Sequence, residues 1–131
     1  MANDSYLLLY VDDPAASARF YATLLEQEPV EAHPGFVLFV LPSGLALGLW
    51  RRSEVTPPAL ATAEPGAEPG AELGFKVADA AAVDATCAAW RARGAEIVLP
   101  PVDLDFGRSF VACDPDGHRL RVFAANEEEE R

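Results

Sequence analysis

The feature that most restricts the fold of this chain is an internal repeat. The segment YLLLYVDD at residues 6–13 matches ELGFKVAD at residues 72–79 in pattern, and each strand-like stretch ends in Asp before a helical stretch. The later segment FVLFVLPSGLALGLW likewise resembles SFVACDPDGHRLRVF, so that Trp50 aligns with Phe123. Self-similarity of this kind indicates that one supersecondary unit is used twice. The sequence therefore predicts two βαβββ modules in an α+β fold.

Helix signals follow the Asp in both copies. Asp13 can cap a helix whose first position is Pro14, where a missing N–H is harmless. Asp79 has the same role in the second copy, and Gly94 suits the left-handed backbone that ends a helix. Apolar residues recur at helical spacing in both stretches: Ala18, Tyr21, Leu24 and Leu25 in the first, and Ala80, Val83, Cys87 and Trp90 in the second. We therefore expect each helix to bury one apolar face, with Trp90 in the core.

The two copies are joined by a segment that has no means of forming a core. It is rich in Pro, Ala, Glu and Gly and repeats EPGA directly, which is typical of a surface linker. We expect a single domain over residues 1–131 that is made of module one at 1–52, the linker at 53–71, module two at 72–124 and an acidic tail at 125–131.

The phase of four strands follows from the repeat, because alternate residues of a strand point to opposite faces. One face of these strands is wholly apolar and is expected to pack against the helices. The other face mixes aromatic, charged and small residues: Tyr6, Leu8, Tyr10, Ala46, Gly48, Trp50, Glu72, Gly74, Lys76, Arg119, Arg121 and Phe123. If the modules pair into one curved mixed sheet with the helices on its outer face, this second face lines an aromatic cleft.

The candidates for ligand contact in this cleft are Trp50, Arg121, Glu72, Tyr6, Gly48, Tyr10, Phe106, Phe39 and Phe110. Trp50 ends its strand on the cleft side, where its indole can stack on a planar ring or, alternatively, pack on another subunit. Arg121 is expected to look into the cleft and to anchor a carboxylate. Phe106 follows a loop and can close the cleft, whereas Phe39 and Phe110 lie on strands whose phase the pattern does not determine.

Charge and composition exclude some partners. The formal net charge of −11, from 21 acidic and 10 basic residues, argues against nucleic acid, whose binders need a basic surface. No apolar run approaches the roughly 18 residues that a membrane span requires, and no signal peptide is evident, so we expect a cytoplasmic protein without a membrane partner. Cys87 and Cys113 lack C-x-x-C spacing and are expected to be buried, reduced thiols.

The opening LYVDDPAASARFYATLL and the ending FVACDPDGHRLRVF resemble the vicinal oxygen chelate superfamily, which contains glyoxalases, extradiol dioxygenases and bleomycin-resistance proteins. The resemblance covers the chain except for the linker and the acidic tail. Within that superfamily, FVLPSGLALGLW and DFGRSFVACDPDGHRLRVF are most similar to phenazine-resistance proteins, which bind and sequester an aromatic antibiotic. The resemblance implies a homodimer with two clefts, each built by modules of one chain or of two.

The resemblance also implies where a metal would bind. Enzymes of the superfamily hold a divalent metal with one inward residue on each of four strands, and the matching positions are Tyr6, Gly48, Glu72 and Arg121. Only Glu72 is an ordinary ligand, because glycine has no side chain, tyrosine must first be deprotonated, and a guanidinium repels a metal ion. His33 and His118 fall on none of these positions. We therefore expect no metal and no cofactor.

Other catalytic motifs are also missing. PSG at residues 42–44 is predicted to be a hairpin turn rather than a nucleophile elbow, and no glycine-rich phosphate loop occurs. Glu72 and Arg121 have two possible roles. Glu72 can be a catalytic acid with Arg121 as its electrostatic partner, or the two can form a salt bridge at the bottom of the cleft. Two functions remain. The first is metal-independent binding and sequestration of a planar aromatic small molecule, antibiotic or phenazine-like, that confers resistance. The alternative is a glyoxalase- or dioxygenase-like lyase or isomerase acting in the same cleft.

Overall fold

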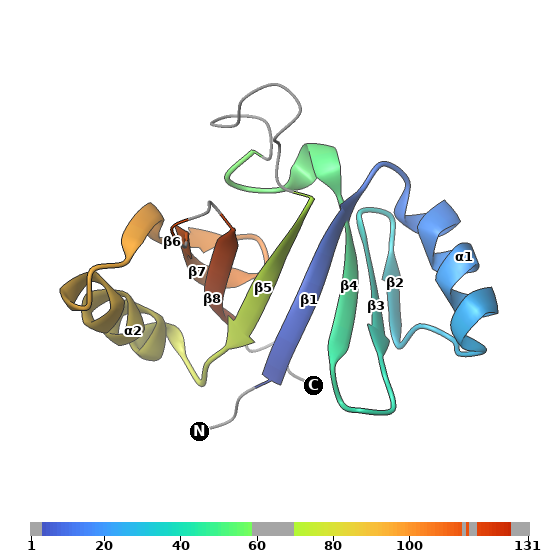
Figure 1. Cartoon of the computed structure of the whole chain (residues 1–131), viewed down its shortest axis with the longest axis horizontal. Helices are drawn as coiled ribbons and strands as arrows, with labels where there is room; N and C mark the ends of the chain where they lie inside the picture. The colour runs from blue at the N-terminus through green and yellow to red at the C-terminus, as the bar shows by residue number, and fades with distance from the viewer. Residues whose placement is uncertain (1–3, 59–69, 114, 116–117, 127–131) are drawn as a thin grey trace. The chain divides into compact units, whose positions relative to one another are not determined.

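The computed structural model describes residues 4–58, 70–113, 115 and 118–126, which hold eight strands, two α-helices and one short 3-10 helix (Figure 1). The chain divides into two compact units: the first unit is Tyr6–Glu72, and the second unit is Leu73–Arg131 together with Met1–Ser5. The elements follow one another as β-α-β-β-β twice. The predicted α+β fold with two βαβββ repeats is therefore confirmed.

The first repeat contains β1 (Asp4–Val11), α1 (Pro14–Leu25), β2 (Glu31–His33), β3 (Phe36–Val40) and β4 (Ala46–Arg51), followed by the 3-10 helix η1 (Arg52–Glu54). These strands lie in the order β2-β3-β4-β1. β1 is parallel to β4 and the other two pairs are antiparallel, so the sheet is mixed. α1 contacts β3 and β4 and covers one face of this sheet (Figure 1).

α1 begins as the sequence predicts. The Asp13 side chain accepts hydrogen bonds from the backbone N–H groups of Ala15 and Ala16, and Pro14 is the first helical residue. The helix ends at Leu25 and is capped by Glu26, whose φ of 53° lies in the left-handed region that usually favours glycine.

The core of the first unit lies between α1 and the sheet. Its members are Val37, Phe39, Leu47 and Leu49, packed with Leu7, Leu9, Val11, Leu41, Ala18, Tyr21 and Ala22. The apolar strand face is therefore the helix-facing one, as predicted. Leu24 and Leu25 are exposed at 63% and 38%, contrary to the predicted helix face, because the helix residues that pack on the sheet end at Ala22.

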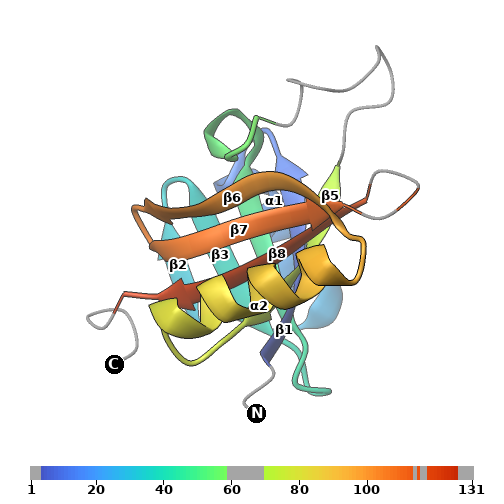
Figure 2. The same ribbon diagram turned by 90° about the vertical axis from the view of Figure 1, so that its left-hand side faces the viewer.

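The second repeat contains β5 (Ala71–Lys76), α2 (Ala80–Ala92), β6 (Glu96–Leu104), β7 (Gly107–Cys113) and β8 (Arg119–Ala125). These strands lie in the order β5-β8-β7-β6, and β7 pairs antiparallel with both β6 and β8. Figure 2 shows α2 in front of this sheet, where it contacts β6, β7 and β8.

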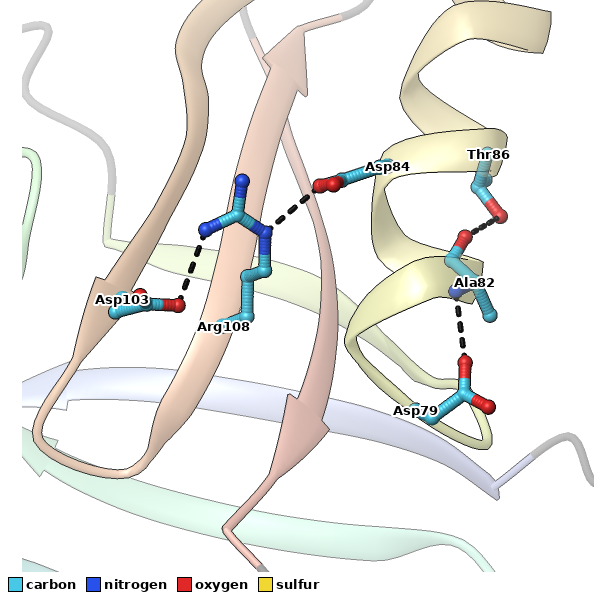
Figure 3. Close-up of polar contacts among 6 residues, drawn as sticks. All are labelled: Asp79, Ala82, Asp84, Thr86, Asp103 and Arg108. Atoms are coloured by element: carbon cyan, nitrogen blue, oxygen red, sulfur yellow. Dashed lines mark hydrogen bonds and ion pairs between the residues drawn. The ribbon is translucent and has the colours of Figure 1, made fainter.

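The ends of α2 also match the sequence signals. Asp79 accepts a hydrogen bond from the backbone N–H of Ala82 at 2.8 Å, which caps the first turn (Figure 3). Gly94, just past the helix, has a φ of 96°, a conformation that glycine adopts without steric cost.

The core of the second unit forms under α2. Val83 and Cys87 pack with Phe110, Ala112, Val122 and Ala124, whereas Ala80, predicted on the same helix face, is exposed. Trp90 meets Phe75 and Phe110 edge-to-face, with ring centroids 6.1 and 5.5 Å apart. Trp90 therefore packs against the core as predicted, but it is itself only half-buried. Both cysteines are free thiols, and Cys113 is only half-buried.

A surface ion-pair network joins α2 to β6 and β7 (Figure 3). Arg108 of β7 donates to Asp84 of α2 at 2.7 Å and to Asp103 of β6 at 3.0 Å. The hydrogen bond to Asp84, followed by that to Asp103, raises the pKa of the Arg108 guanidinium above its ordinary value. Because both carboxylates are exposed, salt screens the network and its contribution to stability is small.

Some predicted segments lie outside the described residues. They include most of the linker, at 59–69, and most of the acidic tail, at 127–131. In the part of the chain that the structure describes, no helix is long and apolar enough to cross a membrane.

Candidate functional site

The sheet face opposite α1 carries four aromatic side chains of the first unit, of which Tyr6, Phe36 and Trp50 are half-buried and Tyr10 is buried. Strand register places three residues of β1 beside three of β4 and three of β3 on this face: Tyr6, Leu8 and Tyr10; Ala46, Gly48 and Trp50; Val40, Leu38 and Phe36. Its β1 and β4 members are those that the repeat predicts. We call these nine residues the open face of the first unit.

Trp50 packs on an aromatic support formed by the buried ring of Tyr10. Its ring meets that of Tyr10 edge-to-face, with centroids 6.4 Å apart and planes at 82°. Tyr10 and Val55, which complete this cluster, are each 3% exposed, whereas Trp50 is half-buried. Arg52 also holds the backbone of this cluster, because its guanidinium donates a hydrogen bond to the Tyr10 carbonyl at 3.1 Å. The indole is thus held at one edge and accessible over part of its surface.

A buried carboxylate lies beside this support. The Tyr10 hydroxyl donates to Oε1 of Glu72 at 2.5 Å, and Glu72 is only 3% exposed. The backbone N–H of Tyr10 also donates to the carbonyl of Gly70 at 2.9 Å, which brings the two chain segments together. A hydrogen bond to a buried carboxylate offsets part of the cost of removing its charge from water. Tyr10 is therefore a partner of Glu72 that the sequence did not predict.

The space above Gly48, a predicted ligand contact, is filled by protein side chains. A Cβ atom at Gly48 would lie 2.5 Å from Cδ2 of Leu8 and 2.8 and 2.9 Å from Cε1 and Cζ of Phe36. Phe36, which is half-buried, was absent from the sequence-based candidates. Its alternation with Val37 in β3 would have identified it, had the facing direction of β3 been known.

The sheet face opposite α2 carries Arg121 in the second unit. Arg121 donates to Oγ of Ser109 at 3.1 Å, and its guanidinium carbon lies 5.9 Å from the ring centroid of Phe106. Phe106 in turn meets Phe123 edge-to-face, with centroids 6.1 Å apart. The exposed fraction of Arg121 is 1%, so in this structure the guanidinium is packed against protein groups and is not presented to solvent.

The predicted ligand-contact residues fall into three groups. Trp50, Tyr6 and Phe106 are half-buried and keep accessible surface. Tyr10, Glu72, Gly48 and Arg121 are buried on the faces opposite the helices. Phe39 and Phe110 have no exposed surface and belong to the cores under α1 and α2. Their assignment to the ligand face is corrected, because the alternation of β3 and β7 turns both rings toward the helices.

The residues at the four positions where the resemblance places metal ligands do not fit a divalent metal. Gly48 offers no donor atom, Arg121 is a cation, and the Glu72 carboxylate accepts the Tyr10 hydroxyl. Within residues 4–58, 70–113, 115 and 118–126, no three His, Cys, Asp or Glu side chains are grouped to hold a metal ion. A zinc site needs about four nitrogen, sulfur or oxygen ligands, and this donor set cannot supply them.

Comparison with known proteins identifies the family of this chain. The family model described as Glyoxalase/Bleomycin resistance protein/Dioxygenase superfamily matches residues 5–122. The phenazine antibiotic resistance protein EhpR of Enterobacter agglomerans is 29% identical over 120 residues, which cover 88% of this chain and 86% of that protein. A superfamily member from Vibrio splendidus shares the fold, with a TM-score of 0.62 at 20% identity over 94% of this chain and 99% of its own.

Another solved structure that is similar to this chain is named for a different activity. A crystal structure described as NAD-dependent benzaldehyde dehydrogenase from Legionella pneumophila has a TM-score of 0.85 at 40% identity, and the match covers 93% of this chain and 99% of that one. The present sequence contains no G-x-G-x-x-G segment of the kind that binds a dinucleotide pyrophosphate. The match shows that this chain is similar to that protein in fold and sequence.

Proposed function

Because this chain belongs to the Glyoxalase/Bleomycin resistance protein/Dioxygenase superfamily, we propose that it binds and sequesters a planar aromatic small molecule without a metal and so confers resistance to it. The observation that carries the proposal is the half-buried indole of Trp50, braced by the buried ring of Tyr10 on the open face of the first unit. The similarity to a phenazine antibiotic resistance protein supports a phenazine-like ligand. The cytoplasmic homodimer with two clefts remains a prediction.

The side chains of the open face are better suited to stacking on a planar ring than to catalysing a reaction. A planar ring on the indole gains about 0.5–1.5 kcal/mol per ring pair beyond the area that it buries. A rigid support adds to affinity, because little side-chain freedom is lost when the ligand binds. Tyr6, half-buried on the same face, is a second proposed contact in this unit. The carboxylate of Glu72, which would be the base in a metal-free isomerase, is already hydrogen-bonded to Tyr10.

Removing the indole is expected to weaken binding. Trp50→Ala should lower the affinity for phenazine by about 1–3 kcal/mol through lost stacking and buried area, and Trp50→Phe should recover part of the loss. Isothermal titration calorimetry measures the phenazine affinity of both variants. Because Trp50 packs on the buried Tyr10 and Val55, Trp50→Ala should also lower the melting temperature, and the affinities are compared at a temperature where each variant is folded.

Fluorescence supplies the control, because Trp50 and Trp90 are the two tryptophans of the chain. In a Trp90→Phe variant, phenazine should quench the remaining emission in step with the calorimetric binding curve. Quenching that requires Trp90 would show that another surface binds the ring. Turnover of the bound compound by chelator-treated protein would instead support the metal-free isomerase alternative.

Metal removal is expected to change nothing. Treatment with a chelator should leave the melting temperature and the phenazine affinity unaltered, since a metal that binds the folded state would add stability that chelation removes. Differential scanning fluorimetry before and after chelation measures this directly. A fall of several degrees, reversed by one particular divalent metal, would contradict metal-independent binding.

A further inference from the structure

A second aromatic side chain lies beside Trp50 on the open face of the first unit. Phe36, the first residue of β3, is the register partner of Trp50 in β4, and the two strands are antiparallel. Directly opposed residues point to the same face with their Cβ atoms about 4.5–5.5 Å apart. Both side chains are half-buried, so both retain accessible surface. The face therefore presents two neighbouring aromatic side chains, and together they are wider than a single ring.

Gly48 determines where the Phe36 ring lies. Cε1 and Cζ of the ring would come within 2.8 and 2.9 Å of a Cβ atom at Gly48, so the end of the ring rests on the β4 backbone. Leu8, at 6% exposed, closes the other side of the same space. A real side-chain carbon essentially never approaches another this closely, so any larger residue at position 48 must displace the Phe36 ring and the Leu8 side chain.

The backbone that leads into Phe36 is held by residues of β4 and η1. The Arg51 backbone N–H donates to the Gly35 carbonyl at 2.9 Å, and its guanidinium donates to the Pro34 carbonyl at 2.7 Å. Arg51 also pairs with Glu54 at 3.2 Å, and the Glu54 carboxylate lies where a Cβ atom of Gly35 would be. Phe36 is thus fixed at its backbone and at its ring, which is the arrangement expected of a preorganised contact surface.

We propose that Phe36 is a second ligand-contacting wall and that Gly48 is the residue that positions it. This inference rests on the proposed binding function and deepens it by naming the ligand class. Trp50 and Phe36 side by side match a fused system of two or three rings, because a single ring covers only one of them. In this proposal Gly48 touches no ligand and affects binding by leaving room for the Phe36 ring.

The test compares phenazine, a tricyclic compound, with pyrazine, its single central ring, on the full chain by calorimetry. Phe36→Leu is expected to weaken phenazine binding roughly tenfold, on the scale of one lost stacking partner, and to change pyrazine binding far less. Phe20→Leu is the matched control, since it makes the same exchange at a 60% exposed position on α1. Its phenazine affinity should equal that of the wild-type protein.

A double-mutant cycle tests the role of Gly48. Gly48→Ala should also weaken phenazine binding several-fold, but adding it to Phe36→Leu should cost little more, because contacting residues that act as one unit are not additive. Unfolding curves confirm that each variant is folded at the titration temperature. Full additivity would overturn the positioning role of Gly48, and unchanged phenazine affinity in Phe36→Leu would overturn the second wall while leaving the proposed function intact. A wild-type protein that binds no phenazine would overturn both.

Discussion

Replacing Gly107 with alanine is expected to lower the free energy of unfolding by about 3–5 kcal/mol, a large part of the stability of a domain of this size. Gly107 begins β7 with a φ of 143°, a backbone conformation that side-chain-bearing residues rarely adopt. A Cβ atom there would lie 2.0 Å from the carbonyl oxygen of Ala124. That oxygen belongs to the backbone of β8, so the clash can be relieved only by moving the strand. Urea unfolding followed by circular dichroism measures the loss.

Gly44→Ala is the matched control for this variant. Gly44 also has a positive φ, 96°, but nothing lies within 4 Å of its Cβ position. Its replacement should therefore cost only the backbone term, roughly 1 kcal/mol. If Gly44→Ala and Gly107→Ala lose the same stability, the close approach of β7 to β8 is not the cause.

Replacing Arg121 with leucine is expected to lower the free energy of unfolding by about 3 kcal/mol. The guanidinium is 1% exposed, donates to Ser109 and lies over the Phe106 ring. Leucine is shorter and carries no donor, so it leaves a cavity and removes hydrogen bonds made inside the protein. Ser109→Ala removes one acceptor only and should cost nearer 1 kcal/mol. Chemical denaturation of the two variants provides the comparison.

Arg121→Leu also tests whether Arg121 has a structural role or anchors a ligand. An anchor would bind the carboxylate of an acidic ring compound, so Arg121→Leu would then weaken phenazine carboxylate far more than uncharged phenazine and leave stability almost unchanged. From the burial of Arg121 we expect the opposite pattern: a large loss of stability, with the two compounds affected alike. Titration of both compounds at a temperature where the variant is folded separates the outcomes.

Features that depend on neighbouring residues in the chain were predictable from the sequence. The repeat shows the order βαβββ twice, and the capping residues Asp13 and Asp79 mark where the helices begin. Alternation along β1, β4, β5 and β8 identified the helix-facing side of these four strands, although Leu73 of β5 is 47% exposed. These signals are local, because backbone periodicity and capping involve residues within a few positions of one another.

Features that depend on how strands pair required the tertiary structure. The sequence contains no sign that Tyr10 donates to Glu72, that Phe36 fills the space above Gly48, or that Arg121 is enclosed. A glycine on a strand predicts close approach equally well for a ligand and for a neighbouring side chain. The register of β3 against β4 pairs Gly48 with Leu38, and only the packing of the side chains shows that Phe36 and Leu8 fill the space above Gly48.

The assignment of Phe39 and Phe110 shows the same limit. Phe39 lies in the continuous apolar run FVLFV and Phe110 begins the short apolar run FVAC, and within these runs period-two alternation carries no polar marker to show which face is buried. The hydrogen-bond register turns these two rings toward the helices and turns Phe36 the other way. A one-residue shift of register would exchange the two faces of a strand. The sequence by itself therefore determined the modules, their helix caps and the helix-facing side, and strand pairing decided which aromatic side chains remain accessible, because that choice depends on contacts between residues far apart in the chain.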